Sequence, residues 1–129
     1  MPEDRVAHPH ALPNYQNAVI LREKVEKYCL DSRHESSAYG KSSGKDKARV
    51  FKAALGFEQI DWELFRQRIL EALPYHEAIL GDEDEYGKRY NVHVKITGPN
   101  GKTEVVLTAW IVRPRTDYPS FTTAWCMGA

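Results

Sequence analysis

Apolar residues recur every three or four positions in three stretches of the first half of the chain, which is the spacing of amphipathic helices. These stretches are residues 19–30, 45–55 and 61–73. Gly56 is a stop signal after the second stretch, Asp61 can cap the third, and Pro74 ends it. We therefore expect three N-terminal helices, the first two joined by a long Ser-, Gly- and Lys-rich surface loop, residues 31–44.

The second half of the chain alternates apolar and polar residues, which is the period of a β-strand. Asn100-Gly101 lies between two alternating segments and predicts a hairpin with a two-residue type I′ turn, because both residues accept a positive φ. In that register Val92 faces Ala109, and one face of the hairpin is wholly apolar. A further strand is expected over residues 120–126.

These elements predict an α+β fold, in which three N-terminal helices pack on a three- to four-stranded antiparallel meander sheet. An acidic loop, residues 81–85, leads into the sheet. Residues 1–12 lack periodicity and are expected to be a linker or tail, whereas residues 13–129 form a single domain. No apolar run approaches the roughly 20 residues of a membrane span, and the N-terminus lacks a secretion signal.

The 18 basic and 18 acidic residues cancel, which argues against a protein that coats nucleic acid by charge alone. The charges nevertheless lie in blocks. Residues 33–52 and 87–119 are mainly basic, and residues 57–86 are mainly acidic. Either the molecule is polarised, with its acidic block held away from an anionic ligand, or the blocks are alternating solvated faces.

Most catalytic and metal-binding motifs are absent from the sequence. There is no metal-ligand spacing, no Ser/His/Asp order and no Gly-rich dinucleotide turn. The string from Gly40 to Asp46 superficially resembles a phosphate-binding loop, but Asp46 stands where Ser or Thr is required. Cys29 and Cys126 lack a CxxC partner and are expected to be reduced, core-packed thiols. We expect neither a metal nor a cofactor.

Lys47 is the first candidate for a functional side chain. It precedes Val50 and Phe51 by three and four residues, so it shares their core-facing stripe on the second predicted helix. It also lies in the first turn, where a cation is disfavoured by the exposed N–H groups. Either Lys47 and the helix N-terminus hold an anion such as a phosphate, or its stem passes the apolar stripe to reach water.

The polar face of the predicted hairpin supplies the other candidates. His93 is expected opposite Thr108, where the pair would combine an acid or base with a hydroxyl that positions a phosphate. Trp110 is expected on the same face beside Arg89 and Lys95, which suits stacking on a base. The alternatives are an ordinary exposed histidine, and an indole that the loop before the second helix covers.

An ordered set of short motifs resembles an uncharacterised bacterial domain family, whose members recur at the C-termini of polymorphic toxins and in phage-associated proteins. The resemblance covers residues 12–125. The motifs are Leu12-Pro13-Asn14, Lys47-Ala48-Arg49-Val50-Phe51, Leu55-Gly56-Phe57, Tyr86-Gly87 with Tyr90, Gly98-Pro99-Asn100-Gly101, Thr108-Ala109-Trp110 and Thr122-Thr123-Ala124.

The layout of helices followed by a meander sheet also resembles, in architecture alone, the fold shared by the barnase, colicin D and RelE ribonuclease toxins. The resemblances imply that the functional positions are Lys47, Thr108, Trp110, and Thr122 or Thr123. Such a domain would act in the cytoplasm of a bacterial cell and would have a cognate immunity protein. His93 and His34 belong to none of these motifs and are proposed from their chemistry.

The first hypothesis is therefore a metal-independent ribonuclease, the toxic C-terminal domain of an interbacterial effector, which cleaves either single-stranded RNA or a tRNA loop by attack of a 2′-hydroxyl. Lys47, His93, Thr108, Thr122 and Thr123 would be catalytic, and Arg49, Arg89, Lys95, Trp110 and His34 would bind RNA. The second is a non-catalytic interaction module, an immunity-like protein or adaptor that uses the acidic stretch and the third helix to meet a basic partner. A nucleotidyl- or ADP-ribosyl-transferring toxin ranks third, because no arginine and glutamate constellation supports it.

Overall fold

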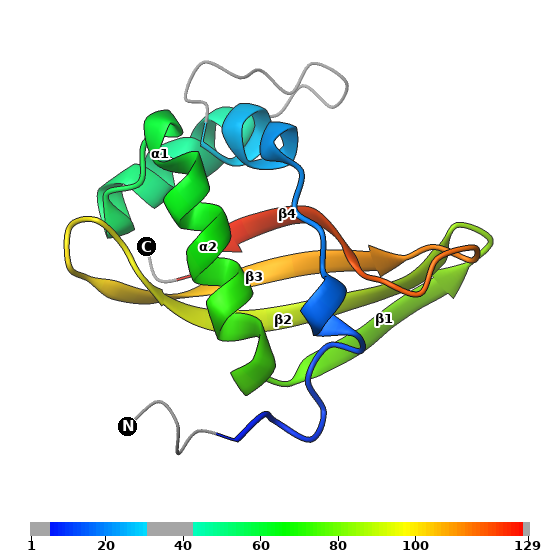
Figure 1. Cartoon of the computed structure of the whole chain (residues 1–129). Coiled ribbons are helices and arrows are strands. Elements are labelled where there is room, and N and C mark those ends of the chain that lie inside the picture. Colours follow the sequence, from blue (N-terminus) through cyan, green and yellow to red (C-terminus); the bar gives the residue numbers. More distant parts are fainter. Residues whose placement is uncertain (1–5, 31–42, 128–129) are drawn as a thin grey trace.

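The computed structural model describes residues 6–30 and 43–127, and these form an α+β fold. Helical segments come first and a four-stranded antiparallel sheet of order β1-β2-β3-β4 follows (Figure 1). The helical segments are η2 (Tyr15–Asn17), η3 (Lys24–Cys29), α1 (Ser43–Leu55), η5 (Gln59–Asp61), α2 (Trp62–Ala72) and η6 (Leu73–Tyr75). The strands are β1 (Ala78–Asp84), β2 (Gly87–Thr97), β3 (Thr103–Val112) and β4 (Ser120–Cys126). None of the helices described is long and apolar enough to cross a membrane.

Two of the predicted elements differ in kind from the sequence prediction. The first predicted helix, residues 19–30, contains the π-helical segment η3. The predicted acidic loop, residues 81–85, is wrong for most of its length, because β1 runs to Asp84. Asp61 does not cap α2 with its side chain, since its Oδ2 instead accepts a hydrogen bond from the N–H of Glu58, at 2.9 Å.

The N-terminal stretch from Val6 to Leu12 contacts the rest of the domain. The N–H of His8 donates to the carbonyl of Pro74 at 2.8 Å, and Leu12 is buried.

The predicted register of the β2–β3 hairpin is wrong by one residue. Val92 pairs with Thr108 rather than Ala109, and Thr97 and Thr103 form the last pair before the turn. The loop therefore spans five residues, 98–102, in place of the two-residue turn. A type I′ turn needs positive φ at both central residues, and Gly101 has φ +84° while Asn100 is not in that region.

The hairpin turn is longer because it docks on the C-terminal end of α1. The N–H of Asn100 donates to the carbonyl of Leu55 at 3.2 Å, and its Nδ2 donates to the carbonyl of Ala54 at 3.3 Å. A Cβ at Gly98 would lie 2.0 Å from that Leu55 carbonyl oxygen, so only glycine fits there. Two of the family motifs, Leu55-Gly56-Phe57 and Gly98-Pro99-Asn100-Gly101, thus form one structural contact.

The register shift exchanges the two faces of β3, because side chains alternate along a strand. Val106, Thr108 and Trp110 are buried against the helices, whereas Leu107 and Ala109 lie on the outer face. The predictions that placed Thr108 and Trp110 on a polar face are therefore wrong. Trp110 is only 1% exposed, and its Nε1 donates to the Thr108 hydroxyl at 2.8 Å, which in turn donates to the carbonyl of Val92 at 2.8 Å. The polar side-chain atoms of the Thr108-Ala109-Trp110 motif are therefore hydrogen-bonded within the core.

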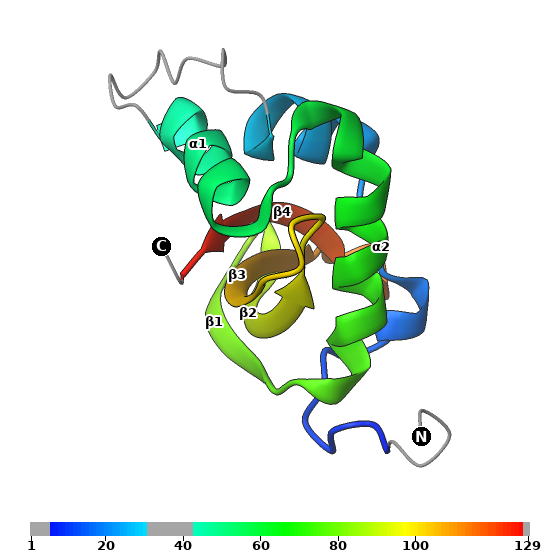
Figure 2. The same cartoon turned by 90° about the vertical axis from the view of Figure 1, so that its left-hand side faces the viewer.

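The core lies between the inner face of the sheet and the helices. α2 runs along one side of the strands, while α1 and η3 lie above β4 (Figure 2). Phe65 of α2 packs edge-to-face on Phe51 of α1, with 4.9 Å between ring centroids, and on Phe57 at 5.1 Å. Each fully buried Phe stabilises the fold by about 1.5–3 kcal/mol, and each such ring pair adds roughly 0.5–1.5 kcal/mol. This aromatic cluster fixes α1 relative to α2.

Candidate functional site

α1 and β4 bring three side chains together at the β4 edge of the sheet. The ammonium of Lys47 lies 2.6 Å from the hydroxyl oxygen of Thr123 and 4.3 Å from the ring centroid of Trp125. Lys47 is in the N-terminal half of α1, where the buried neighbours Ala48 and Phe51 hold the helix against the core. We call Lys47, Thr123 and Trp125 the α1–β4 site.

A β-bulge in β4 turns Thr123 and Trp125 away from the core. Ala109 pairs with Thr123, but the next residue of β3, Trp110, pairs with Phe121, so Thr122 is the extra residue. Phe121 and Ala124 point inward and are buried, whereas Trp125 is 39% exposed. The bulge therefore fixes which of the two threonines meets Lys47.

Burial of the site affects both titratable groups near it. Desolvation lowers the pKa of Lys47, and the nearby Cys29 opposes this shift. Burial raises the pKa of the Cys29 thiol, opposed by the positive charge of Lys47 and by hydrogen bonding from Ala124 and Thr123. Cys29 therefore lies beneath the site as a neutral thiol. Both cysteines are free.

Lys47 is a cation without an acidic partner in the described part of the chain. No carboxylate there lies within ion-pair distance of its ammonium, whereas the described pairs join Arg22 to Glu26 and Arg89 to Asp84, among others. A lysine ammonium has three N–H donors, and the Thr123 hydroxyl accepts one of them. The remaining two N–H donors of Lys47 are suited to oxygen atoms of an anion.

The outer face of the sheet extends from this site toward β2. Thr123 pairs with Ala109, which pairs with Asn91, and Trp125 pairs with Leu107, which pairs with His93. His93 is exposed on the same face as Trp125, two strands away from it. The predicted pair of His93 with Thr108 is wrong, because His93 faces Leu107 and Thr108 lies in the core.

The family described as Domain of unknown function (DUF6883) matches residues 11–128. The chain belongs to this family. No curated protein and no solved structure matches it.

The remaining predicted site residues are dispersed in this DUF6883 domain. Arg89 donates to the carboxylate of Asp84 at 2.8 Å, at the far end of β2. Arg49 and Lys95 are exposed on α1 and β2, and Thr122 is exposed at the bulge. His34 lies outside the described residues. Of the predicted catalytic residues, the structure brings Lys47 and Thr123 into contact.

The sequence analysis missed Trp125 as a member of the site and Cys29 as its buried neighbour. Trp125 lies two residues after Thr123, so the alternation of strand side chains places both on one face once Thr123 is known to point outward. That signal was present in the sequence of the DUF6883 domain. The environment of Cys29 depends on how η3 packs on β4, which no local pattern reveals.

Within the described residues, no group of three His, Cys, Asp or Glu side chains is arranged to hold a metal ion. The α1–β4 site presents an ammonium and a hydroxyl beside an indole face. An ammonium is not a metal ligand, so the chemistry of this donor set suits an anion.

Proposed function

We propose that the α1–β4 site binds a phosphodiester group of RNA, and that the domain is a metal-independent ribonuclease. The observation that carries the proposal is the half-buried Lys47 ammonium, hydrogen-bonded to Thr123 and without a carboxylate partner among the described residues. A desolvated cation interacts with a phosphate more strongly than a fully solvated one, because the effective dielectric constant is lower.

The reaction needs few groups from the protein. The 2′-hydroxyl of a ribose attacks the adjacent phosphorus, the bond to the 5′-oxygen of the next nucleotide breaks, and that oxygen takes up a proton. The products are a 2′,3′-cyclic phosphate and a 5′-hydroxyl end. The Lys47 ammonium, held in place by the Thr123 hydroxyl, would stabilise the negative charge that develops on the phosphate oxygens.

Trp110 is buried and cannot stack on a base, but another aromatic residue is available for this role. Trp125 is partly exposed and adjoins Lys47, so it takes the role that the sequence assigned to Trp110. His93 lies two strands from Trp125, about 10 Å at ordinary strand spacing, which is too far for a proton transfer at a phosphate held by Lys47. It would instead contact a neighbouring nucleotide of an RNA strand that crosses the outer sheet face from Trp125 over Leu107. Lys95, exposed on the same strand and face as His93, would contact a neighbouring phosphate.

The biological setting follows from the resemblance to domains at the C-termini of polymorphic toxins. On this proposal the domain acts on RNA, tRNA included, in the cytoplasm of a bacterial cell, and a cognate immunity protein restrains it. Net charge is zero. We therefore expect recognition of a particular RNA structure at a local site, because the whole surface does not attract RNA.

The decisive experiment is an RNA cleavage assay in EDTA. We expect the purified protein to cut total bacterial RNA into discrete fragments with 2′,3′-cyclic phosphate ends. Lys47→Ala should slow cleavage by about 10²–10³-fold, the usual loss when a donor to a developing oxyanion is removed. Lys52→Ala is the matched control, because Lys52 is an exposed lysine on the same helix.

Cleavage that persists undiminished in Lys47→Ala would remove the α1–β4 site from the mechanism. Equal cleavage of RNA and of the corresponding DNA would exclude attack by a 2′-hydroxyl. RNA that stays intact at micromolar protein would favour the second hypothesis, a non-catalytic interaction module.

A further inference from the structure

The rest of the chain contacts the two edges of the sheet to different extents. The outer edge of β4 is covered at its first residues, where Val19 forms a parallel bridge with Ser120 and exchanges backbone hydrogen bonds with Pro119 and Phe121, at 2.9 and 2.8 Å. η3 and α1 also pack against β4. The outer edge of β1 meets the described chain at its first residue, where the N–H of Ala78 donates to the carbonyl of His10 at 2.8 Å. No other described segment pairs with β1 on that side.

The open part of β1 carries backbone groups ready for another strand. Successive residues of a strand direct their N–H and C=O groups to opposite sides. Because Ala78 donates outward to His10, the N–H of Leu80 also points outward, whereas Ile79 is directed toward Asn91 of β2. The pairing of β1 with β2 is irregular between Leu80 and Glu83, so the regular part of this edge is short and ends at Leu80. An uncovered edge is a template for strand addition.

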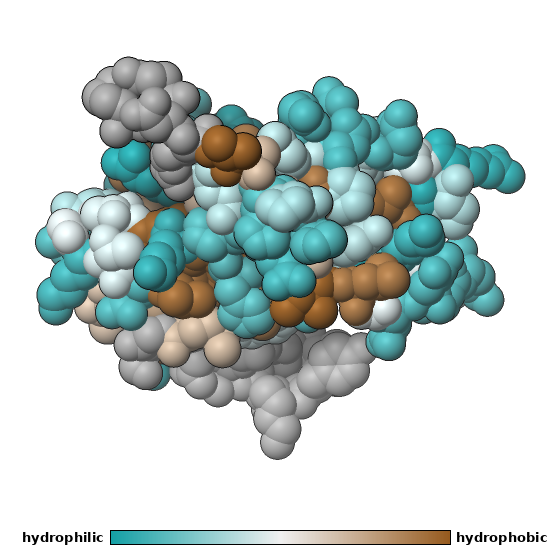
Figure 3. Space-filling view, turned by 90° about the horizontal axis from the view of Figure 1, so that it is seen from below, coloured by the Kyte–Doolittle hydropathy of each residue, from teal (hydrophilic) through white to brown (hydrophobic). Residues whose placement is uncertain are grey.

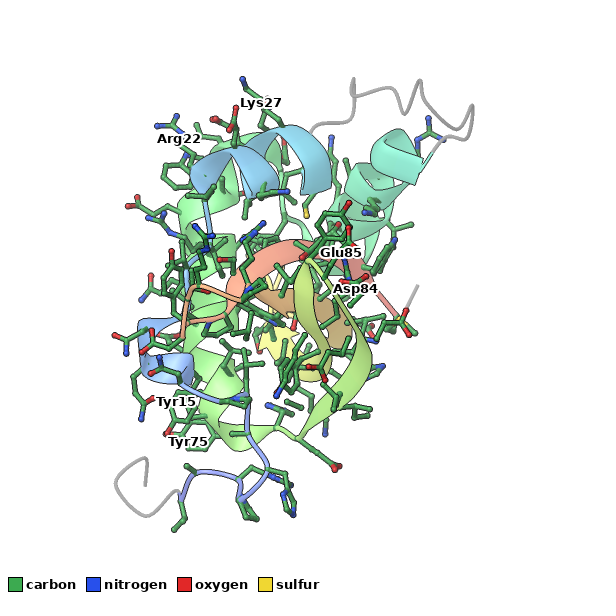
Figure 4. The ribbon with its side chains drawn as sticks, turned by 90° about the vertical axis from the view of Figure 1, so that its right-hand side faces the viewer. Tyr15, Arg22, Lys27, Tyr75, Asp84 and Glu85 are labelled. Atoms are coloured by element: carbon green, nitrogen blue, oxygen red, sulfur yellow. The ribbon has the colours of Figure 1, made fainter. Side chains whose placement is uncertain are left out.

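The side chains along β1 combine apolar and acidic groups. Ile79 and Leu80 are 52% and 55% exposed. Three exposed acidic residues follow, namely Asp82, Glu83 and Glu85. Asp84 is already engaged, since Arg89 and the N–H of Tyr86 hydrogen-bond to its carboxylate and hold its pKa below the usual value. Figure 4 shows Asp84 and Glu85 where β1 turns into β2, and Figure 3 shows apolar patches in a mostly polar surface when the molecule is seen from below.

We infer that the edge of β1 binds a basic, extended segment of another protein, which adds to the sheet as a fifth strand. Backbone hydrogen bonds to the outward groups around Leu80 would hold the segment, and its apolar side chains would cover Ile79 and Leu80. The acidic side chains alone would be a solvated surface, but beside an open edge they select a basic partner. The same charges repel a second copy of this chain, because two β1 edges would bring the acidic groups together.

This inference does not depend on RNA cleavage, and its test uses a peptide. The probe is a fluorescent peptide of about ten residues in which Lys and Val alternate, and binding to the full chain is followed by fluorescence anisotropy. We expect saturable binding that weakens with added salt, and at least about tenfold weaker binding of the Glu and Val counterpart. Lys47→Ala should bind the Lys and Val peptide as the parent does.

Two variants test the edge itself. Leu80→Pro removes one outward N–H without removing a hydrogen bond to β2, and it should weaken binding at least about tenfold. Asp82→Asn with Glu83→Gln and Glu85→Gln removes the free acidic charges and should have a similar effect.

A matched triple variant elsewhere separates local from overall charge. Glu23→Gln with Glu63→Gln and Glu104→Gln changes the net charge equally on other exposed or half-buried positions and should bind as the parent does. Equal binding by the Leu80→Pro and parent proteins, or equal loss in both triple variants, would overturn the inference. Concentration-dependent dimerisation that Leu80→Pro abolishes would overturn it as well, because the occupant would then be a second copy.

Discussion

At the scale of single residues, Lys47 is the side chain whose environment is least explained by folding. Several other motif residues have packing roles. Thr108 and Trp110 hydrogen-bond to each other in the core, and Asn14 donates from Nδ2 to the carbonyl of Asp117 at 2.7 Å. Lys47 instead holds a charge in a partly desolvated position. Destabilising arrangements of this kind are retained in proteins where a functional site requires them.

That cost predicts the effect of removing the charge. Lys47→Met keeps most of the apolar stem, and we expect it to raise the melting temperature by about 1–3 °C at neutral pH while abolishing RNA cleavage. The pKa of Lys47 is lower in the folded chain than its ordinary 10.5, so the unfolded chain binds more protons between the two values. The stability contributed by the native lysine therefore rises with pH in that window.

The measurement is urea unfolding of the native and Lys47→Met proteins at neutral pH and at about pH 10. The stability difference should shrink at the higher pH, because the folded protein gives up the Lys47 proton more readily than the unfolded chain does. Lys52→Met, on an exposed lysine of the same helix, controls for the general effect of removing a lysine. A Lys47→Met protein that is less stable than the parent at neutral pH would show that the contacts with Thr123 and Trp125 outweigh the desolvation.

At the scale of elements, α1 and the β2–β3 turn depend on each other. We expect Gly98→Ala to destabilise the fold by about 2–4 kcal/mol, because its Cβ would collide with the carbonyl oxygen of Leu55. Gly101→Ala is the control, since a Cβ there meets nothing within 4 Å and only the positive φ opposes it, at about 1 kcal/mol. Thermal unfolding of both variants measures the loss of stability. Equal losses in the two variants would mean that the close contact between Gly98 and Leu55 does not restrict the residue at position 98.

This contact also explains how far the sequence predicted the fold. The α+β class, the helices at 45–55 and 61–73 and the hairpin over Asn100-Gly101 followed from periodicity and turn chemistry, and the structure contains all of them. The hairpin register was wrong, because the turn geometry is set by α1 and a local pattern carries no information about that distant partner. The error moved Thr108 and Trp110 to the wrong face, since a shift of one residue turns every side chain of a strand.

For the candidate site, the sequence identified Lys47 because a lysine in the first turn of an apolar stripe is locally unfavourable. It also named Thr123 as one of two threonines. The choice between Thr122 and Thr123 depends on the β4 bulge, which arises from pairing with β3. Patterns within one element were therefore sufficient to nominate residues, and contacts between elements were needed to assemble them.

At the scale of the whole molecule, the two proposed binding regions lie at opposite ends of the sheet order. β2 and β3 separate β1 from β4, which is about 14 Å at ordinary strand spacing. RNA at Lys47 and an added strand on β1 should therefore be able to bind the protein at the same time.

We expect a saturating concentration of the Lys and Val peptide to leave the affinity for a short, non-cleavable 2′-deoxy oligonucleotide unchanged within about twofold. Anisotropy of the labelled oligonucleotide measures this, with free peptide and oligonucleotide mixed as the control for their direct association. Strong competition would mean that the nucleic acid extends across the outer face as far as β1. A protein partner on that edge would then act as an inhibitor, because it would occupy the path of the RNA without touching Lys47.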